Sequence, residues 1–182
     1  METATLDVLM EVAVDHGGYI PTRAARERGI APARLVTLAR RGSLERFGHG
    51  LYRIPGYPID RNDDLIRAVL WTNERGAISH ETALGLYELA DVNPVAIDVT
   101  VDKDYRIARA GGERYRVYRE DLDERIVRLH EGVRVVDVAT SIRGAMAQGV
   151  GTALIFDAID RARRLGWITE PTATNLRAEL NA

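Results

Sequence analysis

Side chains that perform catalysis or bind metals are present in this sequence, but their spacing matches no common site. His80 and Glu81 are adjacent, as in the HExxH motif of zinc proteases, yet Leu84 stands where that motif requires its second histidine. The four histidines lack the spacing of metal ligands, and the absence of cysteine excludes disulfides, thiolate metal sites and cysteine nucleophiles. The sequence therefore predicts a protein that is not an enzyme and that needs no metal or cofactor.

Carboxylates in the second half of the chain leave one catalytic alternative open. Asp102 and Asp104 are separated by one residue, and so are Asp121 and Asp123, a pattern typical of turns and surfaces. No Walker loop or nucleophile elbow accompanies them. Scattered acids can still converge in a fold, so an enzyme that acts on nucleic acid through these carboxylates remains an alternative.

Arginine is the residue whose distribution indicates a function. From Tyr19 to Ile54 the chain carries eight arginines and two glutamates, a net charge of +6 in a protein whose net charge is −2. Guanidinium groups bind phosphates and can donate two hydrogen bonds to guanine in the DNA major groove. A basic segment within an acidic chain is typical of polyanion binding, and double-stranded DNA is the predicted partner.

Two short helices are predicted to position the first of these arginines. Thr22 follows Pro21 and is predicted to cap the first helix with its hydroxyl group, and Gly29 ends that helix. A second helix is predicted over residues 32–41, with a buried apolar stripe formed by Leu35, Leu38 and Ala39. A short turn that contains glycine, between two helices, is typical of a helix-turn-helix.

A β-hairpin is predicted directly after the second helix. Residues 44–47 and 51–54 alternate in polarity, and the Gly-x-Gly segment at 48–50 permits a tight reversal. Two helices followed by such a ribbon form a winged helix-turn-helix, which places its second helix in the major groove.

The predicted interface combines the exposed face of the second helix with the hairpin, or wing. Base contacts are expected from Arg34, Thr37 and Arg41, and Arg40 is expected at the margin of that face, near the DNA backbone. The wing is expected to contact phosphates or the minor groove. The complete set of predicted DNA-binding residues is Thr22, Arg23, Arg34, Thr37, Arg40, Arg41, Arg46, His49 and Arg53.

The chain is predicted to divide near residue 58. Two prolines within residues 55–58 cannot continue a strand ladder, and the remainder carries 17 basic and 21 acidic residues. Residues 1–58 are predicted to form the DNA-binding domain, which is completed by a helix from Thr5 to His16. Residues 59–182 are predicted to form a mixed α/β domain.

The predicted fold class is therefore α+β. The second domain is expected to contain helices near residues 63–74, 79–89, 139–148, 152–165 and 172–180, and strands near 96–101, 114–118, 125–129 and 133–138.

The hydropathy of the chain predicts a cytoplasmic protein without a membrane partner. No apolar run approaches the roughly 20 residues that span a bilayer. The first twelve residues contain acids and no basic segment, so a signal peptide is not predicted there.

Three segments resemble a known family. They are GGYIPTRAARERGI (17–30), LVTLARRGSLERFGHGLYRI (35–54) and LIRAVLWTNERGAISHETALGLYELADVNPVAIDVTV (65–101). They closely resemble the AbiEi-type antitoxins of bacterial type IV toxin–antitoxin systems, over about residues 5–165, and residues 78–94 are the most specific part.

The resemblance implies a DNA-binding amino-terminal domain and a carboxy-terminal antitoxin domain. It also implies autorepression through inverted repeats in the promoter, and a cognate nucleotidyltransferase-like toxin that is neutralised directly or without a stable complex. The alternative is a stand-alone winged-helix transcriptional regulator whose second domain senses a ligand or mediates dimerisation.

Overall fold

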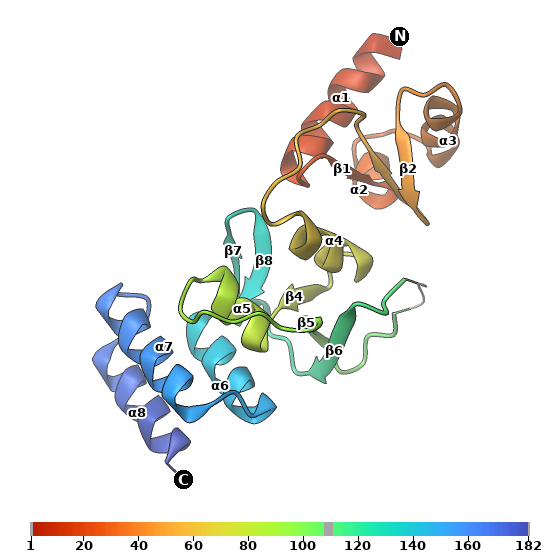
Figure 1. Cartoon of the computed structure of the whole chain (residues 1–182). Coiled ribbons are helices and arrows are strands. Elements are labelled where there is room, and N and C mark those ends of the chain that lie inside the picture. The colour runs from red at the N-terminus through yellow and green to blue at the C-terminus, as the bar shows by residue number, and fades with distance from the viewer. Residues whose placement is uncertain (1, 108–110, 182) are drawn as a thin grey trace. The chain divides into compact units, whose positions relative to one another are not determined.

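Helices and two separate sheets make up the chain, so the α+β prediction is confirmed (Figure 1). The computed structural model describes residues 2–107 and 111–181. The chain forms two compact units, Met1–Ile66 and Arg67–Ala182, which we describe separately.

The amino-terminal unit combines three helices with a three-stranded antiparallel sheet. Its elements are α1 (Glu2–Asp15), β1 (Tyr19–Pro21), α2 (Thr22–Glu27), α3 (Pro32–Arg40), β2 (Glu45–Gly48) and β3 (Leu51–Arg53). β3 is the central strand, between β1 and β2. The predicted helices and hairpin are all present, within three residues of their predicted ends.

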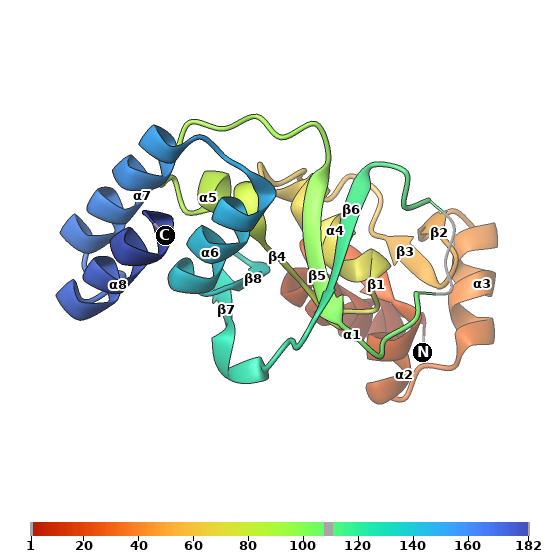
Figure 2. The same cartoon turned by 90° about the horizontal axis from the view of Figure 1, so that it is seen from below.

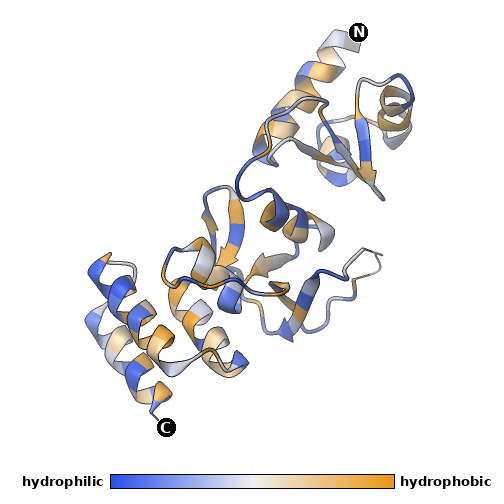
Figure 3. Cartoon of the chain, viewed as in Figure 1, coloured by the Kyte–Doolittle hydropathy of each residue, from blue (hydrophilic) through white to orange (hydrophobic). Residues whose placement is uncertain are grey.

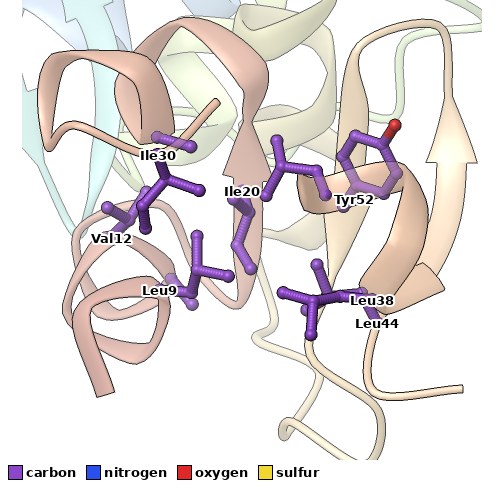
Figure 4. Close-up of a cluster of buried hydrophobic side chains, with 10 residues drawn as sticks. Leu9, Val12, Ile20, Ile30, Leu38, Leu44 and Tyr52 are labelled. Carbon is purple, nitrogen blue, oxygen red and sulfur yellow. The ribbon is translucent and has the colours of Figure 1, made fainter. Parts of the chain in front are cut away.

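One buried cluster holds this unit together (Figure 4). Leu9 and Val12 from α1 meet Ile20 from β1, Leu38 from α3 and Tyr52 from β3. Each element therefore contributes apolar area to the same core, and that burial is the main source of its stability. Because one face of α3 packs against this core, its opposite face remains at the surface.

The turn between α2 and α3 contains the predicted glycine, but the predicted capping of the start of α2 by Thr22 is wrong. Gly29 adopts a φ of +79°, and the next amide, of Ile30, donates to the carbonyl of Ala25 at 2.9 Å. At the other end of α2, Pro21 occupies the cap position and no side chain caps the helix. Thr22 is already helical, and its backbone N–H donates to the carbonyl of Gly50 at 2.9 Å, which ties α2 to the hairpin turn.

The segment after β3 packs against the same unit, beyond the boundary predicted near residue 58. The hydroxyl of Tyr19 donates to both carboxylate oxygens of Asp63, at 3.0 and 3.1 Å. Gly18 lies so close to the ring of Tyr57 that a Cβ atom there would be 2.4 Å from it. Prolines end the strand ladder but do not end packing, and the compact unit extends to Ile66.

The second unit is built on a five-stranded mixed sheet with strand order β6-β5-β4-β8-β7 (Figure 2). Its strands are β4 (Gly76–Ile78), β5 (Ile97–Asp102), β6 (Tyr115–Glu120), β7 (Val127–His130) and β8 (Val133–Val136), with a 3₁₀ turn (Glu124–Ile126) before β7. The helices are α4 (Asp63–Trp71), whose first residues belong to the other unit, α5 (His80–Leu86), α6 (Val138–Gln148), α7 (Thr152–Arg164) and α8 (Glu170–Leu180).

The central strand of this sheet is the element that the sequence did not predict. β4 has three residues, all buried, and is too short to show the alternation that marks a strand. It pairs antiparallel with β5 and parallel with β8.

Helices cover both faces of the sheet. A Cβ atom on Gly76 would meet Val99 of β5 and Thr72, which directly follows α4. The end of α4 therefore lies over the face of Val99. α5 covers the other face, where Thr82 contacts Asp98. Hydrophilic and hydrophobic residues are interspersed along α7 and α8 (Figure 3). An ion pair between Arg143 and Glu179 links α8 to α6.

Candidate nucleic-acid interface

α3 has one buried face and one exposed basic face. Leu35 and Leu38 are fully buried, as predicted, and the helix begins with Pro32 at its first position. Since residues four and seven positions apart lie on the same side of a helix, Ala33, Thr37 and Arg40 share the side opposite the core. This side includes Thr37, as predicted, but with Ala33 and Arg40 rather than Arg34.

The exposure of the α3 arginines differs from the prediction, which put Arg34 and Arg41 on the outward face and Arg40 at its margin. Arg40, expected at the margin, is exposed, and so is Arg41. Arg34 is half-buried, and Thr37 donates its hydroxyl proton to the carbonyl of Ala33 at 3.0 Å. Arg40 is consequently more accessible than Arg34.

The hairpin presents two of its three predicted polar residues. Arg46 lies opposite Tyr52 in the register, and the strand bulges between Arg46 and Gly48. Arg46 and His49 are exposed. Phe47, which the sequence analysis did not single out, is 42% exposed and packs edge-on against Tyr19, with ring centroids 5.1 Å apart.

Arg53, the third predicted hairpin residue, is held inside the amino-terminal unit. Its Nη2 donates to the carbonyls of Tyr57 and Pro58, at 3.0 and 3.3 Å, and its guanidinium lies 5.4 Å from the centroid of the Tyr19 ring. The Nε atom is buried without a hydrogen-bond partner. These contacts fix the segment after β3, so we exclude Arg53 from the candidate interface.

Carboxylates of the same unit compensate several of the other arginines. Arg23 pairs with Glu27 at 2.9 Å, and Arg28 pairs with Glu11 at 2.8 Å. Arg40 and Arg46, in contrast, form no ion pair with the residues that the structure describes. Among the described residues, exposed arginines without an ion pair therefore lie on α2 (Arg26), α3 (Arg40) and the hairpin (Arg46), and such charge suits a polyanion.

A buried polar cluster in the second unit was not predicted. Asp98 is fully buried, and its carboxylate accepts hydrogen bonds from the backbone N–H and the hydroxyl of Thr82, at 3.2 and 3.0 Å, and from the Gln148 amide at 3.3 Å. Arg116 lies 3.5 Å from the same carboxylate. The partners are 16 to 50 residues from Asp98, so no local pattern could have revealed them.

His80 belongs to the same cluster: it is buried at the first position of α5. Its ring stacks on Tyr118 with centroids 3.5 Å apart, its Nδ1 lies 2.9 Å from the Ser79 hydroxyl, and its Nε2 lies 3.8 Å from Glu120. Burial lowers the pKa of His80 from its ordinary value of 6.5, although Glu120 and Asp98 oppose this. Its backbone adopts a φ of +52°.

Two further kinds of feature are absent from the described residues. They contain no group of three or more histidine, cysteine, aspartate or glutamate side chains that could hold a metal ion. None of the described helices is both long and apolar enough to cross a lipid bilayer.

Most of the amino-terminal unit matches a known family. Residues 7–55 match the family described as "Transcriptional regulator, AbiEi antitoxin". Over these residues the predicted resemblance to AbiEi-type antitoxins is confirmed. No curated protein matches the chain.

The fold as a whole is similar to a solved structure, that of the RV2827C protein from Mycobacterium tuberculosis. The two have a TM-score of 0.53 and 12% sequence identity, and the alignment covers 94% of this chain and 70% of the other. At that identity the similarity describes the fold alone.

Proposed function

We propose that this protein is a DNA-binding transcriptional regulator of the antitoxin class, and that its amino-terminal unit is a winged helix-turn-helix. The observation that carries the proposal is the match over residues 7–55 to AbiEi antitoxin regulators. That segment contains α3 and the hairpin, where the exposed arginines lie.

In this proposal α3 enters the major groove and the hairpin lies along the backbone. Arg34, Arg40 and Arg41 are the candidates for guanine contacts, and Thr37 for a base edge or a phosphate. Arg46 and His49 contact phosphates from the hairpin. Thr22 and Arg23, at the start of α2, contact the DNA backbone, which the first helix of such a motif crosses.

We further propose that the protein represses its own operon by binding inverted repeats in the promoter. The second unit then neutralises a nucleotidyltransferase-like toxin encoded beside it, directly or without a stable complex. Neither step requires catalysis by this chain. Support for both comes from the resemblance to AbiEi-type antitoxins. The exposed arginines of α3 support the DNA-binding step alone.

A stand-alone transcriptional regulator is the second candidate, because the family match ends at residue 55 and does not extend into the second unit. The two functions differ in what the second unit does. An adjacent nucleotidyltransferase-like gene, and rescue of its toxicity by this protein when both are expressed from unrelated promoters, favour the antitoxin. Toxicity that persists despite full expression of this protein favours the stand-alone regulator.

The decisive experiment measures binding of the full chain to the DNA upstream of its own gene. Fluorescence anisotropy is recorded with that DNA and with a shuffled duplex of equal length, over a series of salt concentrations. We expect tighter binding to the upstream DNA and an affinity that falls steeply with salt for both duplexes. Equal affinity for both duplexes would contradict sequence-specific regulation, and no binding at low salt would contradict DNA binding altogether.

A further inference from the structure

The second unit contains a pocket of about 450 Å³ that the proposed function does not use. The pocket lies between the end of α5, β7, the start of α6 and the segment that joins α7 to α8. Pockets that bind small molecules have volumes of roughly 300–1,000 Å³, aromatic or apolar walls and a few polar groups that orient the ligand. This pocket has such a volume, and its lining combines three aromatic rings with one cation and one carboxylate.

Strand β7 contributes two side chains to this pocket. Arg128 and His130 are two positions apart, so they point to the same face of the sheet. Tyr87, which directly follows α5, lies on that face too, because its ring centroid is 4.8 Å from that of His130. The cation and the aromatic rings of the pocket are therefore presented on one side of β7.

Packing holds the aromatic wall of the pocket in place. The centroid of the Trp167 ring lies 5.0 Å from that of Tyr87 and 5.2 Å from that of His130. The hydroxyl of Tyr87 donates to the carbonyl of Val136 at 3.0 Å. Both contacts of Trp167 are T-shaped, so none of the described rings stacks parallel on its indole, and the residue is 39% exposed. A flat aromatic ring can therefore stack on Trp167.

The guanidinium of Arg128 is oriented by one of its nitrogens and leaves the other two unoccupied. Its Nη1 donates to the carbonyls of Arg125 and Val127, at 2.7 and 2.9 Å. Its Nε and Nη2 form no hydrogen bond with the residues that the structure describes. These two atoms share one edge of the guanidinium, and their parallel N–H groups match a pair of adjacent acceptors. The O6 and N7 atoms of guanine are such a pair.

The carboxylate of Asp137 offers the complementary acceptor. Its Oδ1 caps α6 by accepting from the Thr140 amide at 2.9 Å, and its Oδ2 accepts no hydrogen bond from the described residues. Burial raises the pKa of Tyr87 to about 12, and the charge of Asp137 adds to this while that of Arg128 opposes it. Both charges therefore lie near the same ring. A ligand of this pocket needs donors that face Asp137 and acceptors that face Arg128.

We propose that this pocket binds a guanine base. The ring stacks on Trp167, its O6 and N7 accept from Arg128, and its N1–H and N2–H₂ groups donate to Asp137. Adenine does not fit, because it carries an N6–H₂ donor where guanine has O6 and an acceptor where guanine has N1–H. Such a site goes beyond the proposed function and does not depend on it.

The test is isothermal titration calorimetry of the full chain, without duplex DNA. The probes are guanosine monophosphate, adenosine monophosphate and ribose 5-phosphate, which carries the phosphate but no base. We expect guanosine monophosphate to bind about tenfold or more tightly than adenosine monophosphate, and ribose 5-phosphate not to bind measurably. Equal affinity for the two nucleotides, or binding of ribose 5-phosphate as tight as that of guanosine monophosphate, would overturn the proposal.

A substitution at Asp137 separates recognition of the base from stability. Asp137→Asn keeps an oxygen that can cap α6 but replaces the other oxygen with an N–H₂ donor, which would face the donors of guanine. The affinity for guanosine monophosphate should fall about tenfold or more, and circular dichroism should show a folded chain. Asp91→Asn is the matched control, because it removes the same charge from an exposed position of the same unit. Native affinity in Asp137→Asn would contradict the proposal.

A second measurement locates the ligand. The chain has two tryptophans, so its nitrogen–proton NMR spectrum should contain two indole signals, which Trp167→Phe assigns. Guanosine monophosphate should shift the Trp167 signal and leave that of Trp71, and the absence of a Trp167 shift would overturn the proposal.

The guanine can come from a free nucleotide or from a nucleic-acid strand. A single-stranded trinucleotide with a central guanine should displace guanosine monophosphate only if the pocket accepts a base within a strand. Since duplex DNA is absent from every measurement, a failure here leaves the DNA-binding proposal standing.

Discussion

The exposed side of α3 and the interior of the second unit differ in whether their charged groups have partners within the protein. Around Asp98 a fully buried carboxylate is surrounded by donors from α5, β6 and α6. On α3 and the hairpin, Arg40 and Arg46 stand at the surface without an ion pair among the described residues. A buried charge and its partners depend on one another, because the loss of one leaves the others uncompensated, whereas an unpaired surface charge is available to an external partner.

The largest expected effect lies on the compensated side of this comparison. Asp98→Ala leaves the Thr82 hydroxyl, the Gln148 amide and the Arg116 guanidinium without their shared acceptor, so the free energy of unfolding should fall by about 3 kcal/mol. Urea denaturation measures this, with the exposed Asp91→Ala as a control that should be nearly neutral. A loss for Asp98→Ala no larger than the control would show that the cluster contributes little to stability.

The next effect lies on the uncompensated side. Arg40→Ala should weaken binding to the upstream DNA by about 1–3 kcal/mol if Arg40 donates two hydrogen bonds to a guanine, and should leave the unfolding midpoint unchanged. Arg34→Ala tests the half-buried neighbour in the same way. Arg164→Ala removes the same charge from the exposed surface of α7 and is the control. Unchanged preference for upstream over shuffled DNA in both α3 variants would mean that this side does not read bases.

A smaller, sequence-independent effect is expected at the hairpin. Arg46→Ala should reduce affinity for upstream and shuffled DNA alike and lower the salt slope by roughly one, because one phosphate contact is lost. Arg53→Ala is the contrasting variant: it should destabilise the amino-terminal unit, since Arg53 binds the carbonyls of Tyr57 and Pro58, and leave the salt slope unchanged. If the two variants changed the slope equally, the distinction between a presented and an internal arginine would be wrong.

The smallest effect concerns pH. Because burial lowers the pKa of His80 in the folded protein, the unfolded chain binds the proton more readily. His80 therefore makes the free energy of unfolding fall as the pH drops below 6.5, until the folded-state pKa is passed. Urea titrations between pH 8 and about pH 5 should be flatter for His80→Gln than for the native chain over this window. An equally steep profile in the variant would assign the dependence to other groups.

A region could be predicted from the sequence when its interactions join residues that are close along the chain, and not when they join distant segments. Gly29, the Gly-x-Gly segment and the stripe of Leu35 and Leu38 are local signals, and they located α2, α3 and the hairpin of the amino-terminal unit. The surroundings of Asp98 and the strand β4 are assembled from distant segments, and neither has a local pattern. Arg53 was misplaced for a related reason, because only the turn after β3 brings the carbonyl of Tyr57 to its guanidinium.

The pairing of β1 with β3 imposes an order of assembly on the newly made chain. Tyr19 pairs with Arg53, so β1 waits for more than thirty further residues before its ladder partner exists. At cellular rates of synthesis that delay is on the order of seconds, whereas an isolated helical turn forms in under a microsecond. During this interval α2 and α3 are available but have no completed sheet to pack on. A nascent chain stalled before residue 51 should therefore be open to proteases throughout, and one stalled well beyond residue 63 should resist them.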